Sequence, residues 1–197
     1  MKLDEIRDYV TANRGKITAE ASAMGRYPKI YMHWTSGSYD TDYADYHFCI
    51  DGEGQISLTH DFDSAVSATW RRNSGSVAVA LNCAYNADGN SLGPYPPTAQ
   101  QIEALAQFVA VACSALNIPI DKEHVMTHGE AANNEDGLRP HPAYAWWNDE
   151  EGDGDTRGDL EYLGTSESPI YNPWATDGSR GGDVIRGKAI FYQQHGM

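Results

Sequence analysis

The fold prediction starts from the stretch Lys29-Ile30-Tyr31-Met32-His33-Trp34-Thr35. Its alternating apolar side chains are typical of a strand buried in a sheet, and the turn-forming residues 36–38 follow it. His33 therefore stands at the carboxyl end of a strand. In open α/β sheets, ligands collect in the crevice beyond these strand ends. His33 is thus the first candidate for a functional site, although most lone histidines at such positions are structural.

A second histidine ends another β-prone run, Val125-Met126-Thr127-His128, and a candidate carboxylate, Asp159, follows further along the chain. Two histidines and a carboxylate suit a catalytic zinc ion, which takes three protein ligands and keeps one position for water. The spacing alone is weak support, because the chain has no local motif such as H-E-x-x-H. The residues by themselves leave a zinc site and separate structural groups as open alternatives.

The other apolar runs predict helices and strands of one α/β domain that spans residues 1–197, with a core over about residues 29–163. The clearest element is a helix that begins after Thr98, because Thr98 and Gln101 form a capping box before an apolar stripe at helical spacing. The other expected elements are a helix over residues 3–13, a hairpin of residues 46–50 and 55–59, a buried strand over residues 77–81 and a last strand over about residues 184–192.

Composition excludes several classes of protein. The chain of 197 residues carries a formal net charge of -14, which argues against nucleic acid and against an anionic membrane surface as partners. No run approaches the roughly 18 apolar residues of a membrane span. Three cysteines without a C-x-x-C arrangement are expected to be buried thiols. The N-terminus has no apolar segment of a signal peptide, so we expect synthesis in the cytoplasm.

The order of motifs resembles the zinc-dependent N-acetylmuramoyl-L-alanine amidases, which share their fold with phage lysozyme-type amidases and peptidoglycan recognition proteins. The matching pieces are His33-Trp34-Thr35, the hairpin from Tyr46 to Gly54, Asn73-Ser74 with the strand after it, the Thr98 cap, His128-Gly129-Glu130 and Arg157-Gly158-Asp159-Leu160. The resemblance implies a central mixed β-sheet flanked by helices. It also implies hydrolysis of the amide bond between N-acetylmuramic acid and L-alanine in peptidoglycan.

By this resemblance, His33, His128 and Asp159 hold one zinc ion that activates water for attack on the amide. Tyr46 matches a tyrosine that hydrogen-bonds the water or the oxyanion. Arg157 matches a lysine that stabilises the oxyanion, and an arginine keeps that charge but is a poor general acid.

The sequence departs from the family pattern at two places. Ala80 occupies the position where many members carry a glutamate as general base, so we expect Glu130 to serve instead, with Tyr46 alone or a supporting role for Glu130 as the alternatives. The segment before Asp159 is longer than in the simplest members, which leaves His141, Asp153 and Asp155 as competing ligands.

Aromatic residues around a groove also stack on sugars. Trp34, Trp70 and Trp147 are therefore candidates for substrate contact, with a place in the core as the alternative. Asn73 is a further candidate for substrate contact.

Two other functions stay open at this stage. One is a catalytically inactive module of the same fold that binds muropeptides, and the other is a cysteine hydrolase. The expected biological role is that of a phage or prophage endolysin, which reaches the cell wall after release from the cytoplasm; cytoplasmic recycling is the weaker alternative. The oligomeric state stays open.

Overall fold

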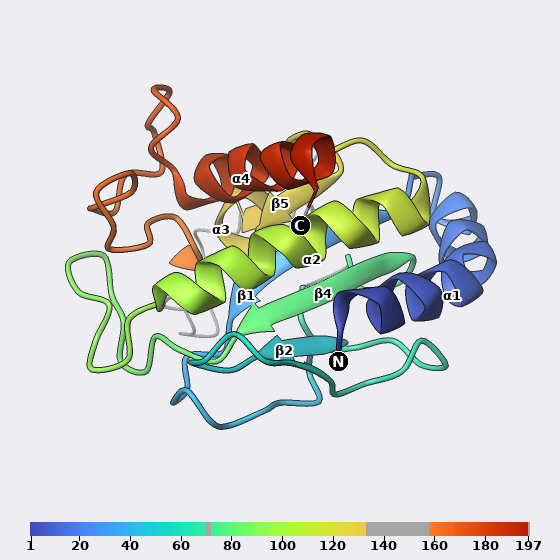
Figure 1. Ribbon diagram of the computed structural model, residues 1–197, viewed down its shortest axis with the longest axis horizontal. Helices are drawn as coiled ribbons and strands as arrows, with labels where there is room; N and C mark the ends of the chain where they lie inside the picture. The colour runs from blue at the N-terminus through green and yellow to red at the C-terminus, as the bar shows by residue number, and fades with distance from the viewer. Residues whose placement is uncertain (70–71, 133–157, 197) are drawn as a thin grey trace, which may run out of the picture.

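The computed structural model describes residues 1–69, 72–132 and 158–196 (Figure 1). A five-stranded mixed sheet with the strand order β3-β2-β4-β1-β5 forms its centre. The strands are β1 (Lys29–Trp34), β2 (Phe48–Ile50), β3 (Ile56–Leu58), β4 (Ser76–Leu81) and β5 (Val125–Thr127). Only the β2–β3 hairpin is antiparallel among these neighbouring pairs. The mixed sheet, the hairpin and the buried central strand that the sequence predicts are confirmed.

Three long helices cover one face of this sheet: α1 (Leu3–Ala23), α2 (Ala99–Leu116) and α4 (Gly181–His195). The middle helix, α2, packs against both α1 and α4 (Figure 1). The expectation that no run approaches a membrane span is wrong for α2, which is long and apolar enough to span a membrane by length and composition. However, 72% of this helix is buried inside the fold. Such burial is what a core helix requires, because its apolar stripe already has a packing partner.

The capping box that starts α2 is present as the sequence predicts. The backbone N–H of Gln101 donates to Thr98 Oγ1 at 3.1 Å, and the Gln101 side-chain oxygen accepts from the Thr98 backbone at 3.0 Å. These two bonds satisfy donors that a helix start leaves unpaired. The helix ends at Asn117, which adopts the left-handed conformation with φ 59°.

Successive side chains of β1 point to opposite faces of the sheet. One face packs into the main core, and the other carries the candidate site. Ile30 and Met32 lie in the main core together with residues of α1 and α2. Tyr31 belongs to a separate small cluster with Met126 and Ala131. Because His33 is two residues after Tyr31, its side chain points to the face away from the three long helices.

Two expectations about helices and strands are wrong. The first helix does not end near Gly15 but runs to Ala23, since Ile17 and Ala21 continue its buried face. The predicted last strand over residues 184–192 is the helix α4. Its apolar run contains β-branched and aromatic residues, but Ile185 and Ala189 are buried at a spacing of one helical turn.

Candidate metal centre

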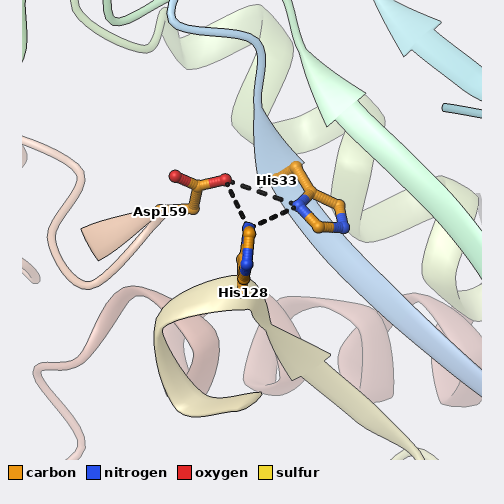
Figure 2. A group of neighbouring side chains, drawn as sticks. All are labelled: His33, His128 and Asp159. Carbon is orange, nitrogen blue, oxygen red and sulfur yellow. Dashed lines mark hydrogen bonds and ion pairs between the residues drawn. The ribbon is translucent and has the colours of Figure 1, made fainter. Parts of the chain in front are cut away.

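Parallel pairing of β1 with β5 brings the two strand-end histidines together. Met32 pairs with Thr127, so His33 and His128 leave the same edge of the sheet side by side. His128 is also the first residue of the short helix α3 (His128–Ala132). Asp159 reaches the same point from a turn that begins at residue 158. Figure 2 shows the three side chains pointing toward one another.

The three side chains are spaced as ligands of one tetrahedral ion. Nδ1 of His33 lies 3.2 Å from Nδ1 of His128 and 3.4 Å from Oδ2 of Asp159, and the third distance, from His128 Nδ1 to Asp159 Oδ2, is 3.3 Å. Metal–ligand bonds of about 2.0–2.1 Å give a tetrahedron with edges of about 3.3–3.4 Å. The donor atoms, two imidazole nitrogens and a carboxylate oxygen, are those that zinc accepts.

Two members of this cluster, His33 and Asp159, are almost completely buried. His33 is fully buried, and this burial lowers its pKa to about 4, although the hydrogen bond with Asp159 opposes the shift. The His33 imidazole is therefore neutral at pH 7. Asp159 is also buried, and its Oδ1 has no hydrogen-bond partner among the described residues. A buried carboxylate beside two imidazole nitrogens fits a cation, because burying it without a compensating charge is costly.

Sequence reasoning missed Thr69, which contacts His33 on its other ring nitrogen. Thr69 Oγ1 lies 3.1 Å from His33 Nε2, and Thr69 is almost fully buried. Asn73 in turn holds the backbone of this loop, because its Oδ1 accepts the N–H groups of Ala68 and Thr69 at 3.1 and 2.7 Å. Asn73 was expected to contact substrate; here its carbonyl oxygen is engaged in the loop that carries Thr69.

Tyr46 lies beside the cluster. Its ring centre is 5.1 Å from that of His33, and its hydroxyl is 3.4 Å from the carbonyl oxygen of Trp34. Burial and the charge of Asp159 raise the pKa of Tyr46 well above its ordinary value. The phenol therefore keeps its proton at neutral pH and is a hydrogen-bond donor, which here donates to the Trp34 carbonyl oxygen over a long 3.4 Å.

Glu130 does not have the surroundings of a general base. Its side chain is 1% exposed, and its oxygens accept from Arg186 at 2.7 and 2.8 Å. The Glu130 Oε2 atom also accepts the backbone N–H of Thr127 at 3.0 Å. Both carboxylate oxygens are therefore already engaged by these donors and are not free to take a proton from water. These contacts fit the supporting role that the sequence left as an alternative.

Ala80 and Trp34 occupy defined places around the cluster. Ala80 is the register partner of His33 across β1 and β4, so the residue that we expect to replace a glutamate carries only a methyl group beside His33. Trp34 is 3% exposed and packs edge-to-face against Tyr162, with ring centres 6.3 Å apart. This burial leaves the ring of Trp34 little surface for a sugar.

Several expected site residues lie outside the described residues. They are Arg157, Trp70 and Trp147, and the competing ligands His141, Asp153 and Asp155. The role of each stays a prediction.

The three cysteines do not resemble catalytic thiols. Cys49, Cys83 and Cys113 are all free and buried. Burial raises the pKa of Cys49 to about 11 and raises the pKa of the other two thiols as well. A thiol that stays protonated at neutral pH is a poor nucleophile.

Fold and site together define a mixed α/β protein in which two histidines and one carboxylate form a buried cluster that could hold a cation. The family model Amidase_2, described as N-acetylmuramoyl-L-alanine amidase, matches residues 12–142, which is more than half of the chain. The chain belongs to this family of peptidoglycan amidases. Asp159 and α4 lie beyond the matched residues.

Among solved structures, the chain is similar to the Ph2119 endolysin from the Thermus scotoductus MAT2119 bacteriophage Ph2119. The sequence identity is 18% and the TM-score 0.41, over 52% of this chain and 71% of that chain. None of the curated proteins compared with this chain matches it.

Proposed function

We propose that this protein is a zinc-dependent N-acetylmuramoyl-L-alanine amidase, with His33, His128 and Asp159 as the ligands. The observation that carries the proposal is the spacing of the three ligand atoms, 3.2–3.4 Å from one another. Zinc in such a site lowers the pKa of water and polarises the carbonyl group under attack. Family membership supplies the substrate, the amide that joins N-acetylmuramic acid to the stem peptide.

The residues of the chain then have separate tasks. His33 and His128 would each supply an imidazole nitrogen to the ion, and Asp159 would supply a carboxylate oxygen. Tyr46 keeps its proton and donates a hydrogen bond to the oxygen on which negative charge develops as water adds to the amide carbonyl. The carbon–nitrogen bond then breaks, the carbonyl carbon keeps the water oxygen as part of a new carboxyl group, and the amino group of L-alanine takes up the proton that the water has lost. Arg157 remains the predicted electrostatic stabiliser of the same oxygen.

A second candidate function is a muropeptide-binding module without turnover. Two observations favour it: Ala80 supplies no carboxylate beside His33, and the carboxylate of Glu130 is bound to Arg186. Under this alternative the protein holds zinc and muropeptide but leaves the amide intact.

The deciding experiment is product identification after digestion of muropeptides by the zinc-loaded protein. We expect mass spectrometry to find a free stem peptide that begins with L-alanine, together with the matching N-acetylmuramic acid fragment. Removal of zinc with a chelator should abolish the reaction, and added zinc should restore it. Intact muropeptide after incubation with stoichiometrically loaded protein would contradict the amidase proposal and support the binding module.

The proposed substrate implies that the protein acts on the bacterial cell wall. The more specific role of a phage or prophage endolysin, released from the cytoplasm to lyse the host cell, stays a prediction.

A further inference from the structure

Two buried ion pairs connect the C-terminal helix to the segments that carry two of the three ligands. The first joins Arg186 in α4 to Glu130, which is two residues after His128. The Arg186 Nη1 and Nη2 atoms donate to separate carboxylate oxygens at 2.7 and 2.8 Å, and both side chains are at most 6% exposed. Because Glu130 also accepts the N–H of Thr127, this pair holds the backbone on both sides of His128.

The second pair joins Arg180, the residue that precedes α4, to Glu161, which is two residues after Asp159. Nε and Nη2 of Arg180 donate to the two Glu161 oxygens at 2.9 and 2.8 Å. These side chains are 4% and 1% exposed. The backbone N–H of Gly181 also donates to the Glu161 carbonyl at 3.1 Å. The two pairs thus repeat one arrangement: an arginine of the C-terminal segment on a glutamate two residues after a ligand.

Two glycines allow these carboxylates to approach the backbone closely. A Cβ atom on Gly129 would collide with the carboxylate of Glu161, and one on Gly182 would lie 2.7 Å from Glu130 Oε2. The backbone of Gly129 also donates to the Asp159 carbonyl at 3.4 Å. The two ligand segments and the start of α4 therefore pack closely against each other around these two carboxylates.

Bidentate Arg–carboxylate pairs fix the relative orientation of the two groups, whereas a lysine ammonium fixes only its distance from the carboxylate. Burying such pairs is expensive in desolvation, so they are weak evidence for stability as such. Because each pair lies next to a ligand, its position indicates that it fixes the placement of that ligand.

We propose that Arg180 and Arg186 are positioning residues of the metal site, which hold Asp159 and His128 at tetrahedral spacing. This inference rests on the proposed zinc function. It makes the C-terminal segment, which lies beyond the family match, part of the metal centre.

The test measures metal binding by the protein variants Arg186→Lys and Arg180→Lys. Each variant keeps the positive charge but loses the bidentate hydrogen bonding of the guanidinium group. The readouts are the zinc Kd, from competition with a chromophoric chelator, and the visible spectrum of the cobalt-substituted protein. We expect the zinc Kd to rise about 10–100-fold and the tetrahedral cobalt bands to weaken. A paired variant, Glu130→Gln with Arg186→Met, leaves no buried charge unpaired and should show the same loss.

The matched control is Lys188→Met. Lys188 is on the same helix but pairs with Glu103 of α2, at 2.8 Å, away from the ligand segments. Its loss should lower the thermal stability of the metal-free protein without changing the zinc Kd or the cobalt spectrum. Wild-type zinc affinity and an unchanged cobalt spectrum in both arginine variants and in the paired variant would overturn the inference. Failure of the wild-type protein to bind zinc would instead overturn the proposed function.

Discussion

The hydroxyl of Thr69 lies 3.1 Å from Nε2 of His33, while the other ring nitrogen of His33 faces His128 and Asp159. A hydrogen bond on one nitrogen fixes both the tautomer and the orientation of the ring. A neutral His33 that donates from Nε2 to Thr69 presents at Nδ1 the lone pair that a metal requires. Thr69 is therefore placed to orient His33 as a ligand.

Replacing Thr69 with valine should weaken zinc binding. The substitution keeps the shape of the side chain but removes the hydroxyl, so we expect the zinc Kd to rise about 10–100-fold, as measured by chelator competition. Thr98→Val is the control. It should lower stability by about 1 kcal/mol through loss of the α2 cap and leave the zinc Kd unchanged. An unaltered Kd in Thr69→Val would refute this role.

Removing the Tyr46 hydroxyl should impair turnover more than metal binding. In Tyr46→Phe the ring next to His33 is retained, but the donor to the developing negative charge is lost. We expect kcat to fall about 10²–10³-fold with an unchanged zinc Kd. Tyr39→Phe is the control, because the Tyr39 hydroxyl donates to the carbonyl of Pro96 and does not contact the ligands. Wild-type kcat in Tyr46→Phe would show that the phenol takes no part.

Stability should fall on mild acidification through His47. Burial lowers the pKa of His47 from 6.5 to about 3. Between these pH values the unfolded chain binds a proton that the folded protein excludes. The contribution of His47 is therefore complete above pH 6.5 and decreases as the pH falls. At about pH 5 this loss amounts to about 2 kcal/mol in the free energy of unfolding of the metal-free protein, as measured with urea.

The variant His47→Asn isolates this effect. His47 Nδ1 accepts the backbone N–H of Ala78 at 3.0 Å, and an asparagine oxygen can accept the same bond without titrating. We expect a smaller change in unfolding free energy between pH 7 and pH 5 than in the wild-type protein. An identical change in both proteins would rule out His47 as the source.

Alkylation should not inactivate the folded enzyme. Because Cys49, Cys83 and Cys113 are buried and their pKa values are raised, iodoacetamide at neutral pH should leave all three thiols unmodified and the activity unchanged. Mass spectrometry of the native protein checks the first point, and the urea-unfolded protein, which should react at three sites, is the control. Loss of activity upon modification of one thiol would revive the cysteine-hydrolase alternative.

Elements whose signals lie within a few residues of sequence could be predicted. The capping box at Thr98 and the hairpin around residues 51–54 are encoded within a few residues, and the structure has both. The histidine at the end of β1 could be placed because parallel strands deliver their carboxyl ends to one edge of a sheet.

The features that the sequence did not reveal depend on contacts between distant segments. Residues 184–192 have a β-prone composition, yet they form part of α4 because Ile185 and Ala189 pack into the core on one helical face. Gly15 does not end α1, since the buried face continues past it and a helical glycine costs only about 1 kcal/mol. Arg186 pairs with Glu130 across 56 residues of sequence, and no local motif predicts such a pair.

The most direct test of the metal site is a crystal structure of the zinc-loaded protein with anomalous diffraction data at the zinc absorption edge. We predict one strong anomalous peak, within about 2.0–2.2 Å of His33 Nδ1, His128 Nδ1 and a carboxylate oxygen of Asp159. A peak coordinated by His141, Asp153 or Asp155 in place of Asp159, or the absence of any peak between the two histidines, would contradict it.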